Sequence, residues 1–240
     1  EFNLFQTINN NFIGTNNLCE ISLEYKIEKF ILISSDKAVN PTNIMGASKR
    51  LSEKCISYYS KFNTTIFSSV RFGNVMGSSG SLIPIFLDQI KRKEPLYVRG
   101  ESTTRFFMTV SEAVSLVFKA SMLAKGGETF ILNMGEKILI KDLAKKIIFL
   151  SGLKEKSIAN PNGDIEIIIS NLKKGEKQFE ELSLGKLINM SEDNFIKMDN
   201  YSNPQFNLLD KIKIYKKIIN NYNKNELIKE LSEDVEGFKF

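Results

Sequence analysis

The sequence predicts an α/β protein built on a parallel sheet. Short apolar runs such as Phe30-Ile31-Leu32-Ile33 and Thr129-Phe130-Ile131-Leu132 alternate with longer segments whose apolar residues recur at helical spacing. The connections between these segments are short, which favours parallel strands with helices between them. Of the 240 residues, 42% are apolar, which is enough to fill a sizeable core.

The first part of the chain holds two helix and strand repeats. An amphipathic segment predicts a helix over 4–25, and the apolar run after it predicts a strand over 29–34. A turn that contains Pro41 precedes a helical pattern over 43–61, and a second apolar run predicts a strand over 65–71. Strands joined through a helix in this way pair in parallel.

After residue 75 the alternation loosens. An Asn- and Lys-rich stretch near the end predicts helices over 207–222 and 224–232, after a break at Pro204. The sequence contains no internal repeats. Between these regions the patterns predict helices over 82–92, 111–123 and 140–151, and strands near 96–98, 105–108, 129–132 and 165–169.

One stretch carries most of the chemical information. The strand over 29–34 leads into Ser35, Asp36 and Lys37, and the helix that follows carries Met45 and Lys49. Open parallel sheets collect reactive side chains at their carboxyl edge. A hydroxyl, a carboxylate and an amine directly after a buried strand, with a second lysine on the next helix, therefore indicate an enzyme.

These residues resemble the active-site region of the nucleotide-sugar 4,6-dehydratases of polysaccharide biosynthesis, a branch of the extended short-chain dehydrogenase/reductase superfamily. Most of that superfamily has a Tyr-x-x-x-Lys pair, whereas this branch often has Met-x-x-x-Lys, as in Met45-Gly46-Ala47-Ser48-Lys49. The likeness covers roughly residues 5–185. Three further blocks occur in the family's order: Arg71-Phe72-Gly73-Asn74-Val75-Met76-Gly77-Ser78-Ser79-Gly80-Ser81-Leu82-Ile83-Pro84, Thr104-Arg105-Phe106-Phe107-Met108-Thr109, and Gly175-Glu176-Lys177 with Glu180-Glu181-Leu182.

The resemblance implies the C-terminal part of a Rossmann-like parallel sheet with helices on both faces, plus a smaller α/β substrate-binding lobe. Residues 1–75 would be the remnant of the NAD-binding domain and would carry the catalytic residues. Residues 76–185 would form the lobe, with one returning strand and with helices, at about 105–150, that pack on the Rossmann core. Residues 186–240 would form a helical tail.

The Gly-rich loop of a dinucleotide-binding fold is absent from the sequence. Such a loop holds the pyrophosphate on a helix N-terminus, and no Gly-x-Gly-x-x-Gly occurs here. The chain also begins at Glu1, inside a predicted helix. We therefore expect an N-terminally truncated fragment that lacks most of the adenine and pyrophosphate site and is inactive alone.

The resemblance assigns the chemistry of dehydration to Ser35, Asp36 and Lys37. Related glucose-nucleotide dehydratases have Thr-Asp-Glu at this place, with a carboxylate as the base that removes the C5 proton. Here Lys37 stands at that position, and Asp36 would protonate the departing C6 hydroxyl. A lysine acts as a base only when its pKa falls well below ~10.4, which burial or a neighbouring cation promotes.

The helix after this tripeptide and the strand after the helix would hold the cofactor. Met45 and Lys49 lie one helical turn apart, and the resemblance directs Lys49 to the ribose hydroxyls of NAD and Met45 to the sugar. Methionine cannot remove a proton, so the proton of the C4 hydroxyl must pass to Ser35, Asp36 or water. Further cofactor contacts are expected from Ser34, Phe72, Asn74 and Val75.

A UDP-sugar is the expected substrate. The loop before the helix at 82–92 offers backbone N–H groups and hydroxyls to a diphosphate. Lys173 stands where the family has arginine, so it keeps the charge but loses the bidentate fork. The expected substrate contacts are Asn74, Ser78, Ser79, Ser81, Arg99, Arg105 and Lys173.

Composition narrows the kinds of partner and ligand expected for the protein. The net charge of +5 comes from lysines spread along the chain among nearly as many acids, so we expect no nucleic acid partner. Cys19 and Cys55 lie among apolar residues without metal-binding or disulfide spacing, which predicts buried thiols and no metal site. No apolar run is long enough to span a bilayer.

These expectations combine into an NAD-dependent UDP-N-acetylhexosamine 4,6-dehydratase for surface polysaccharide or glycan synthesis, such as capsule or lipopolysaccharide. NADP is the alternative cofactor. The location would be the cytoplasm, with a full-length homo-oligomeric parent either free or anchored at the cytoplasmic face of the inner membrane. Two rivals are a nucleotide-sugar C4-epimerase with the same cofactor and a non-catalytic module that only binds a nucleotide-sugar or a protein.

Overall fold

The computed structural model describes residues 3–78, 80–190, 196–199 and 206–240. Ser79 and Pro204, which the sequence analysis singled out, lie outside the described residues. The chain forms two compact units. Unit 1 consists of Glu1–Phe72, Val114–Asn133 and Glu181–Phe240, and unit 2 consists of Gly73–Ala113 and Met134–Glu180.

Unit 1 is built on a five-stranded sheet in the order β1-β2-β7-β12-β11. The strands are β1 (Lys29–Ser35), β2 (Ile66–Phe72), β7 (Thr129–Leu132), β12 (Ile196–Asp199) and β11 (Leu187–Asn189). The first three are parallel, as predicted, whereas β12 is antiparallel to both β7 and β11. Because Ser35 of β1 is in register with Phe72 of β2, the carboxyl ends of these strands are level.

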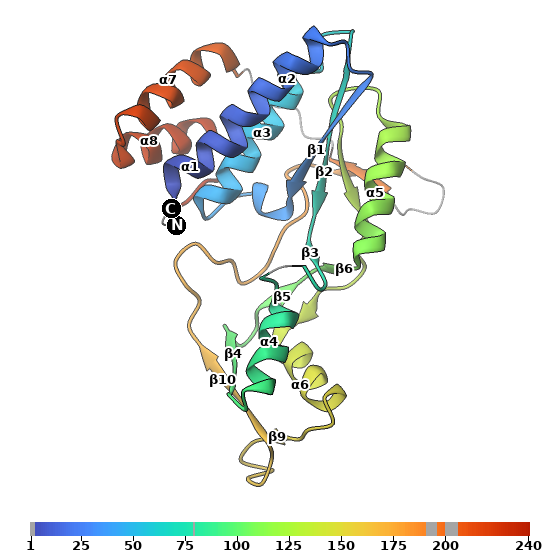
Figure 1. Cartoon of the computed structure of the whole chain (residues 1–240), viewed down its shortest axis with the longest axis vertical. Coiled ribbons are helices and arrows are strands. Elements are labelled where there is room, and N and C mark those ends of the chain that lie inside the picture. The colour runs from blue at the N-terminus through green and yellow to red at the C-terminus, as the bar shows by residue number, and fades with distance from the viewer. Residues whose placement is uncertain (1–2, 79, 191–195, 200–205) are drawn as a thin grey trace. The chain divides into compact units, whose positions relative to one another are not determined.

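Helices cover both faces of this sheet, which confirms the predicted layering. Figure 1 shows α2 (Gly14–Glu24) and α3 (Ile44–Tyr59) on one face and α5 (Val110–Leu123) on the other. The predicted helix over 4–25 is one helical path, in which α1 (Leu4–Ile8) joins α2 through a π-helical turn.

The C-terminal helices complete the core of unit 1. The helices α7 (Leu208–Asn220) and α8 (Lys224–Asp234) contribute buried apolar side chains to the same cluster as α1 and α3. Tyr215 of α7 meets Phe12 edge to face, with ring centroids 5.2 Å apart. The end of the chain is therefore an integral layer of unit 1.

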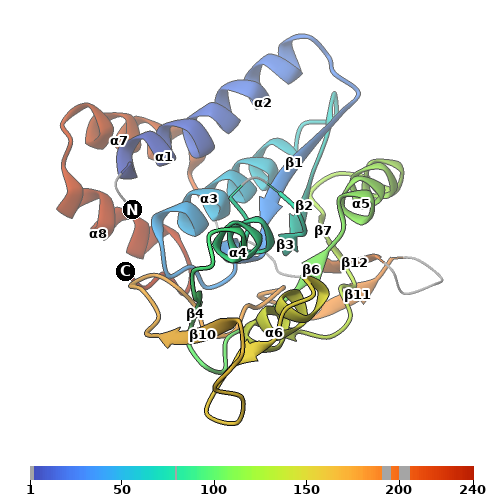
Figure 2. The same ribbon diagram turned by 60° about the horizontal axis from the view of Figure 1, so that its bottom comes forward.

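The described residues of unit 2 form several short sheets, the start of α5 and two further helices. Its core lies where α4 (Leu82–Lys91) and α6 (Ile140–Leu150) pack with the sheet β4-β10-β9, around buried residues such as Phe86 and Ile148. Figure 2 shows α4, α6, β4 and β10 from another side. The strands of unit 2 are β3 (Asn74–Val75), β4 (Leu96–Arg99), β5 (Thr104–Arg105), β6 (Phe107–Met108), β8 (Ile138–Leu139), β9 (Glu155–Lys156) and β10 (Ile165–Ser170).

Two elements lie elsewhere than the sequence analysis expected. The helix at 140–150 was expected on the Rossmann core, but its buried face packs inside unit 2 against α4 and β4, because Ile140, Ala144 and Ile148 form one apolar stripe. The tail after 186 was expected to be helical, but it begins with β11 and β12.

In the described part of the chain, no helix is both long and apolar enough to cross a membrane.

Candidate active site

The structure brings Ser35, Asp36 and Lys37 together at the end of β1. The Ser35 hydroxyl donates to Asp36 Oδ1 at 3.0 Å and accepts the backbone N–H of Lys37 at 3.2 Å. The Lys37 ammonium contacts the same carboxylate oxygen, with Nζ to Oδ1 at 3.0 Å. The hydroxyl of Ser35 and the ammonium group of Lys37 therefore bind the same oxygen atom of the Asp36 carboxylate.

Asp36 has one satisfied and one open carboxylate oxygen. Its side chain is fully buried, and Oδ2 has no hydrogen-bond partner among the described residues. A buried carboxylate oxygen without a partner costs free energy unless it carries a proton or receives a donor from a ligand. The Lys37 side chain is 28% exposed. The pair thus has a buried acid and an amine that reaches the surface.

A tight connection between the tripeptide and α3 fixes this geometry. Asn43 caps α3 by accepting the Gly46 N–H at 2.8 Å. A Cβ atom on Gly46 would lie 2.2 Å from the Lys37 carbonyl oxygen, so only glycine allows this approach. Gly46 therefore sets the distance between the first turn of α3 and the backbone of Lys37.

Lys49 reaches the same edge of the sheet from α3. Its Nζ donates to the Ile33 carbonyl oxygen at 2.9 Å. Burial lowers the pKa of Lys49, and the negative charge of Glu53 opposes part of that shift. An ammonium has three donors, so this one leaves capacity for hydroxyl groups of a ligand. Met45, one turn earlier, is exposed.

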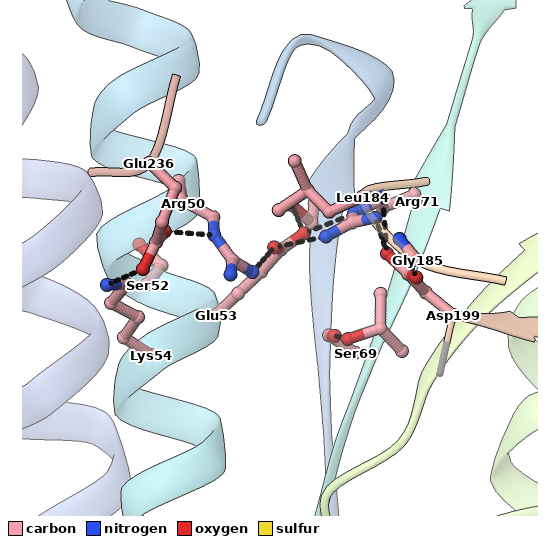
Figure 3. Close-up of polar contacts among 12 residues, drawn as sticks. Arg50, Ser52, Glu53, Lys54, Ser69, Arg71, Leu184, Gly185, Asp199 and Glu236 are labelled. Carbon is pink, nitrogen blue, oxygen red and sulfur yellow. Dashed lines mark hydrogen bonds and ion pairs between the residues drawn. The ribbon is translucent and has the colours of Figure 1, made fainter. Parts of the chain in front are cut away.

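Ser34 takes part in a buried ionic network. Its hydroxyl donates to Glu53 Oε1 at 2.7 Å. Arg71 binds both oxygens of the same carboxylate at 2.7 Å, as Figure 3 shows. Ser34, Glu53 and Arg71 are all buried. These bonds hold β1, β2 and α3 together just below the level of Ser35 and Phe72. A direct contact between the Ser34 side chain and a cofactor stays a prediction.

The network extends to residues that are distant in the sequence. Arg71 also pairs with Asp199 of β12 at 2.6 Å, and Asp199 accepts the backbone N–H groups of Leu184 and Gly185 at 3.1 and 3.0 Å. On α3, Arg50 links Glu53 to Glu236, at 3.0 and 3.4 Å. Figure 3 shows this chain of contacts from Glu236 to Asp199.

Electrostatics keep Glu53 ionised inside the protein. Burial alone would raise the pKa of Glu53, but the charge and hydrogen bonds of Arg71, with further help from Arg50 and Ser34, lower it to about 2. Sequence patterns alone do not single out Glu53, Asp199 or Glu236 as members of this network. A spacing of four residues between Lys49 and Glu53 was the only available signal, and it does not distinguish a buried carboxylate from an exposed one.

Several of the residues predicted to bind cofactor or substrate lie in the segment of unit 2 that directly follows β2. Asn74 and Val75 form β3, and the Asn74 side chain donates to the Phe106 carbonyl oxygen at 3.1 Å. Ser78 donates to the Val75 carbonyl oxygen at 2.9 Å. Ser81 precedes α4, and its buried Oγ has no hydrogen-bond partner among the described residues. That hydroxyl and the first N–H groups of α4 could receive an anionic ligand.

Arg99, Arg105 and Lys173 converge on one segment of unit 2. Arg99 pairs with Glu176, which also accepts the backbone N–H of Lys173 at 3.0 Å. The Arg105 guanidinium donates to the carbonyl oxygens of Lys177 and Gln178, at 2.7 and 3.2 Å. The side chains of Arg99 and Arg105 therefore bind the segment that contains Gly175-Glu176-Lys177, whereas Lys173 is shown to contact it through its backbone.

The two cysteines have no role in such a site. Cys19 and Cys55 are buried free thiols, as predicted. Burial raises the pKa of Cys19 to about 12 and that of Cys55 well above its usual value, so both remain protonated. A search of the described residues finds no cluster of three or more His, Cys, Asp or Glu side chains suited to a metal ion.

Comparison with known proteins places the chain in a family. A family model described as "Polysaccharide biosynthesis protein" matches residues 1–201. The chain belongs to this family. The chain is similar to the capsular polysaccharide biosynthesis protein CapD of Staphylococcus aureus, with 43% identity over 95% of this chain. A UDP-glucose 4-epimerase of Rickettsia canadensis is 34% identical over 80% of the chain.

A solved structure of a relative supports the Rossmann-type fold. Pen from Bacillus thuringiensis is 40% identical, with a TM-score of 0.68 over 76% of this chain and 55% of that one. The chain spans 37% of the length of CapD and 54% of that of the Rickettsia epimerase. The chain therefore spans less than two thirds of the length of each of these relatives.

Proposed function

We propose that the protein provides the catalytic and substrate-binding part of an NAD-dependent UDP-N-acetylhexosamine 4,6-dehydratase for polysaccharide synthesis. One observation carries the proposal: Lys37 and the buried Asp36 share a hydrogen bond at the carboxyl end of β1. On the helix that follows, Met45 stands in place of the tyrosine of ordinary epimerases. Membership of the polysaccharide biosynthesis family supports it. The identity of the sugar rests on the resemblance alone.

The Asp36–Lys37 pair can supply both proton transfers of an elimination. Dehydration needs a base for the C5 proton and an acid for the C6 hydroxyl. Transfer of one proton from Lys37 Nζ to Asp36 Oδ1, which lie 3.0 Å apart, leaves an amine and a carboxylic acid. The amine can then accept the C5 proton while the acid protonates the departing hydroxyl, so the pair ends with the protons it had and releases water.

The residues present suit the nicotinamide-ribose end of NAD. Lys49 has donors beyond the bond to Ile33, and Asp36, at the end of the same strand β1, has a buried oxygen, Oδ2, without a hydrogen-bond partner among the described residues. When bound, NAD supplies a reversible hydride acceptor, which makes the loss of water an internal redox reaction without net oxidation. Ser35, Asp36 or a water must take the proton of the C4 hydroxyl, because Met45 cannot.

The mass of the product tests the reaction. We expect UDP-N-acetylglucosamine, incubated with NAD and an active form of the protein, to yield a nucleotide-sugar that is lighter by one water. A product of unchanged mass would instead identify a C4-epimerase, an alternative that the similarity to a UDP-glucose 4-epimerase supports. Binding of the nucleotide-sugar without turnover in any form of the protein would favour a binding module.

We expect residues 1–240 alone to bind NAD weakly or not at all. The sequence has no Gly-x-Gly-x-x-Gly loop for the pyrophosphate, and Lys49 can hold only the nicotinamide-ribose end. Isothermal titration calorimetry measures this directly. Micromolar affinity for NAD would show that the pyrophosphate site is present in another form.

Replacing Arg105 with alanine should raise the Michaelis constant for the UDP-sugar more than it lowers turnover. A contact with the diphosphate is made equally in the ground state and the transition state. The loss of a charged hydrogen bond predicts an increase on the order of 10- to 100-fold. The control is Arg92→Ala, which removes an exposed arginine paired with Asp88 at 2.8 Å. Unchanged substrate affinity in Arg105→Ala would exclude Arg105 from the site.

The cellular setting is part of the proposal. We expect a homo-oligomer in the cytoplasm, either free or held at the cytoplasmic face of the inner membrane. Size-exclusion chromatography with light scattering and fractionation of cells would measure the two properties.

A further inference from the structure

We infer that Asn40 is a positioning residue for Lys37, and that residues 235–239 and Glu181 hold Asn40 in a strained turn. The inference rests on the role proposed above for Lys37 and concerns what fixes the position of its side chain. The turn consists of residues 36–43, which connect β1 to α3. Residues 235–239, here called the clasp, directly follow α8.

Asn40 has an unfavourable backbone conformation. Its φ angle is +41°, in the left-handed region that residues other than glycine and asparagine seldom adopt. The next residue is Pro41, and a proline restricts the residue before it to extended conformations with a φ of about −120°. Such a conformation persists only where neighbouring contacts hold it, and strained residues of this kind cluster at active sites.

Both ends of the Asn40 amide are held. Its Nδ2 donates to the two carboxylate oxygens of Glu181, at 3.2 and 3.1 Å. Its Oδ1 lies against Gly237, where an added Cβ atom would overlap that oxygen and lie 3.2 Å from Asn40 Cα. Gly237 itself has a φ of +70°, so the clasp needs glycine there both for its conformation and for the space.

The clasp binds both the turn and α3. The Lys239 N–H donates to the Pro41 carbonyl oxygen at 3.0 Å. Glu236 pairs with Arg50 and Lys54 of α3, at 3.4 and 2.6 Å, and Figure 3 shows these contacts. The clasp therefore fixes the turn relative to the helix that follows it.

A change at Asn40 reaches Lys37 because the ends of the turn are fixed. One end is paired in register with β2, and the other end caps α3. The two residues between Lys37 and Asn40 are completely buried, and the Lys37 carbonyl oxygen lies against Gly46. A change of φ at Asn40 therefore displaces Lys37, and a displacement of its Nζ breaks the 3.0 Å contact with Asp36.

Competitive acylation of the 240-residue protein tests the inference without requiring turnover. A limiting amount of acetic anhydride labels lysines, and mass spectrometry gives the extent at Lys37 relative to Lys141. Lys141 is a matched internal standard, because it is 30% exposed and ion-paired at 2.9 Å, whereas Lys37 is 28% exposed and ion-paired at 3.0 Å. We expect Gly237→Ala to raise this ratio on the order of tenfold, since the added methyl group displaces Asn40 and frees the Lys37 ammonium from its charged hydrogen bond.

Gly152→Ala is the matched control for backbone strain. Gly152 has a φ of +75°, close to that of Gly237, but nothing except its chain neighbours lies within 4 Å of a Cβ atom added there. This variant should leave the acylation ratio unchanged.

Two variants of Glu181 isolate its hydrogen bond to Asn40. Glu181→Ala and Glu181→Gln remove the same charge, but only glutamine keeps a side-chain oxygen that can accept Asn40 Nδ2. We expect Glu181→Ala to raise the acylation ratio of Lys37 and Glu181→Gln to keep it near the wild-type value. Thermal melts check that each variant is folded; if Gly237→Ala is not, the two Glu181 variants decide.

The kinetic consequence appears in turnover and not in substrate affinity. In an active form of the protein, Gly237→Ala should lower kcat on the order of 10²-fold, because a small misplacement of a reacting group has an effect of that size. The Michaelis constant for the UDP-sugar should change little, since neither Asn40 nor the clasp is assigned to the substrate.

Three results would overturn the inference: unchanged acylation of Lys37 in Gly237→Ala, equal effects of Gly237→Ala and Gly152→Ala, or equal ratios in the two Glu181 variants. Each of them leaves the proposed role of Lys37 as a base intact. Near-normal turnover of Lys37→Ala would instead refute that role, and the acylation ratios would still report what holds Lys37 in place.

Discussion

Replacing Lys37 with alanine should nearly abolish dehydration while leaving cofactor affinity unchanged. Lys37 is the amine at the carboxyl end of β1, its Nζ lies 3.0 Å from Asp36, and no histidine exists in the chain to replace it as a base. A positioned general base is worth on the order of 10²–10⁴-fold in rate, and the loss in kcat should fall in that range. Lys49, not Lys37, is assigned to the cofactor, so NAD affinity should persist.

The variant Lys37→Arg separates a base from an ion-pair partner. Arginine can still pair with Asp36, but its guanidinium cannot lose a proton in a protein. If Lys37 acts only by holding Asp36, Lys37→Arg should work nearly as well as the wild type; if Lys37 is the base, both variants should fail. Asp36→Asn should lose both exchange of the C5 hydrogen with heavy water and elimination, because the amide cannot take the proton that Lys37 must give up to become a base. Near-normal turnover of Lys37→Ala would move the base to another residue.

Replacing Glu53 with alanine should cost about 3–5 kcal/mol of unfolding free energy, a large part of the stability of an ordinary domain. The change leaves Arg71 and Arg50 buried without the carboxylate that both of them bind. Urea unfolding followed by circular dichroism measures the loss. Glu233→Ala, which removes the partner of Lys229 in an exposed pair 4.0 Å apart, should change the unfolding free energy by less than about 1 kcal/mol.

The same carboxylate predicts a pH dependence with a defined direction. The pKa of Glu53 falls to about 2 in the folded protein, below its ordinary value of 4.5. Its contribution is therefore complete above about pH 4.5 and is lost as the pH falls toward about 2. The difference in unfolding free energy between wild type and Glu53→Gln should shrink over this interval. A constant difference would mean that the charge of Glu53 does not stabilise the fold.

Long periodic elements could be predicted from the sequence, and very short ones could not. The helix expected over 43–61 is α3, Ile44–Tyr59, because sixteen residues show the helical period several times. Strands such as β3 and β9 have only two residues, which is too few to show any period. The strand β12 was missed for a related reason: in Ile196–Asp199 only four residues alternate, and their partner on β7 lies far away in the sequence.

In the candidate site, too, contacts between residues close in the sequence could be predicted and contacts between distant residues could not. Ser35, Asp36 and Lys37 are consecutive, so a turn after a strand is sufficient to bring them together, and this could be predicted. The pairing of Arg71 with Asp199 joins residues that are 128 positions apart and depends on the complete fold. Gly46 is part of the Met-x-x-x-Lys block, but the sequence does not show why glycine is needed there. The reason is the close approach of the Lys37 carbonyl oxygen, which only the structure shows.

The division of unit 1 into three chain segments determines the order in which the protein can be completed during synthesis. Unit 2 has all its residues once Glu180 has been made, whereas unit 1 still lacks β12, α7 and α8. Until then Arg71 has no Asp199, and the apolar cluster of α1 and α3 lacks the side chains that α7 and α8 contribute to it. A nascent chain therefore carries a finished second unit beside an unfinished first one, and that interval is when aggregation or chaperone binding is expected.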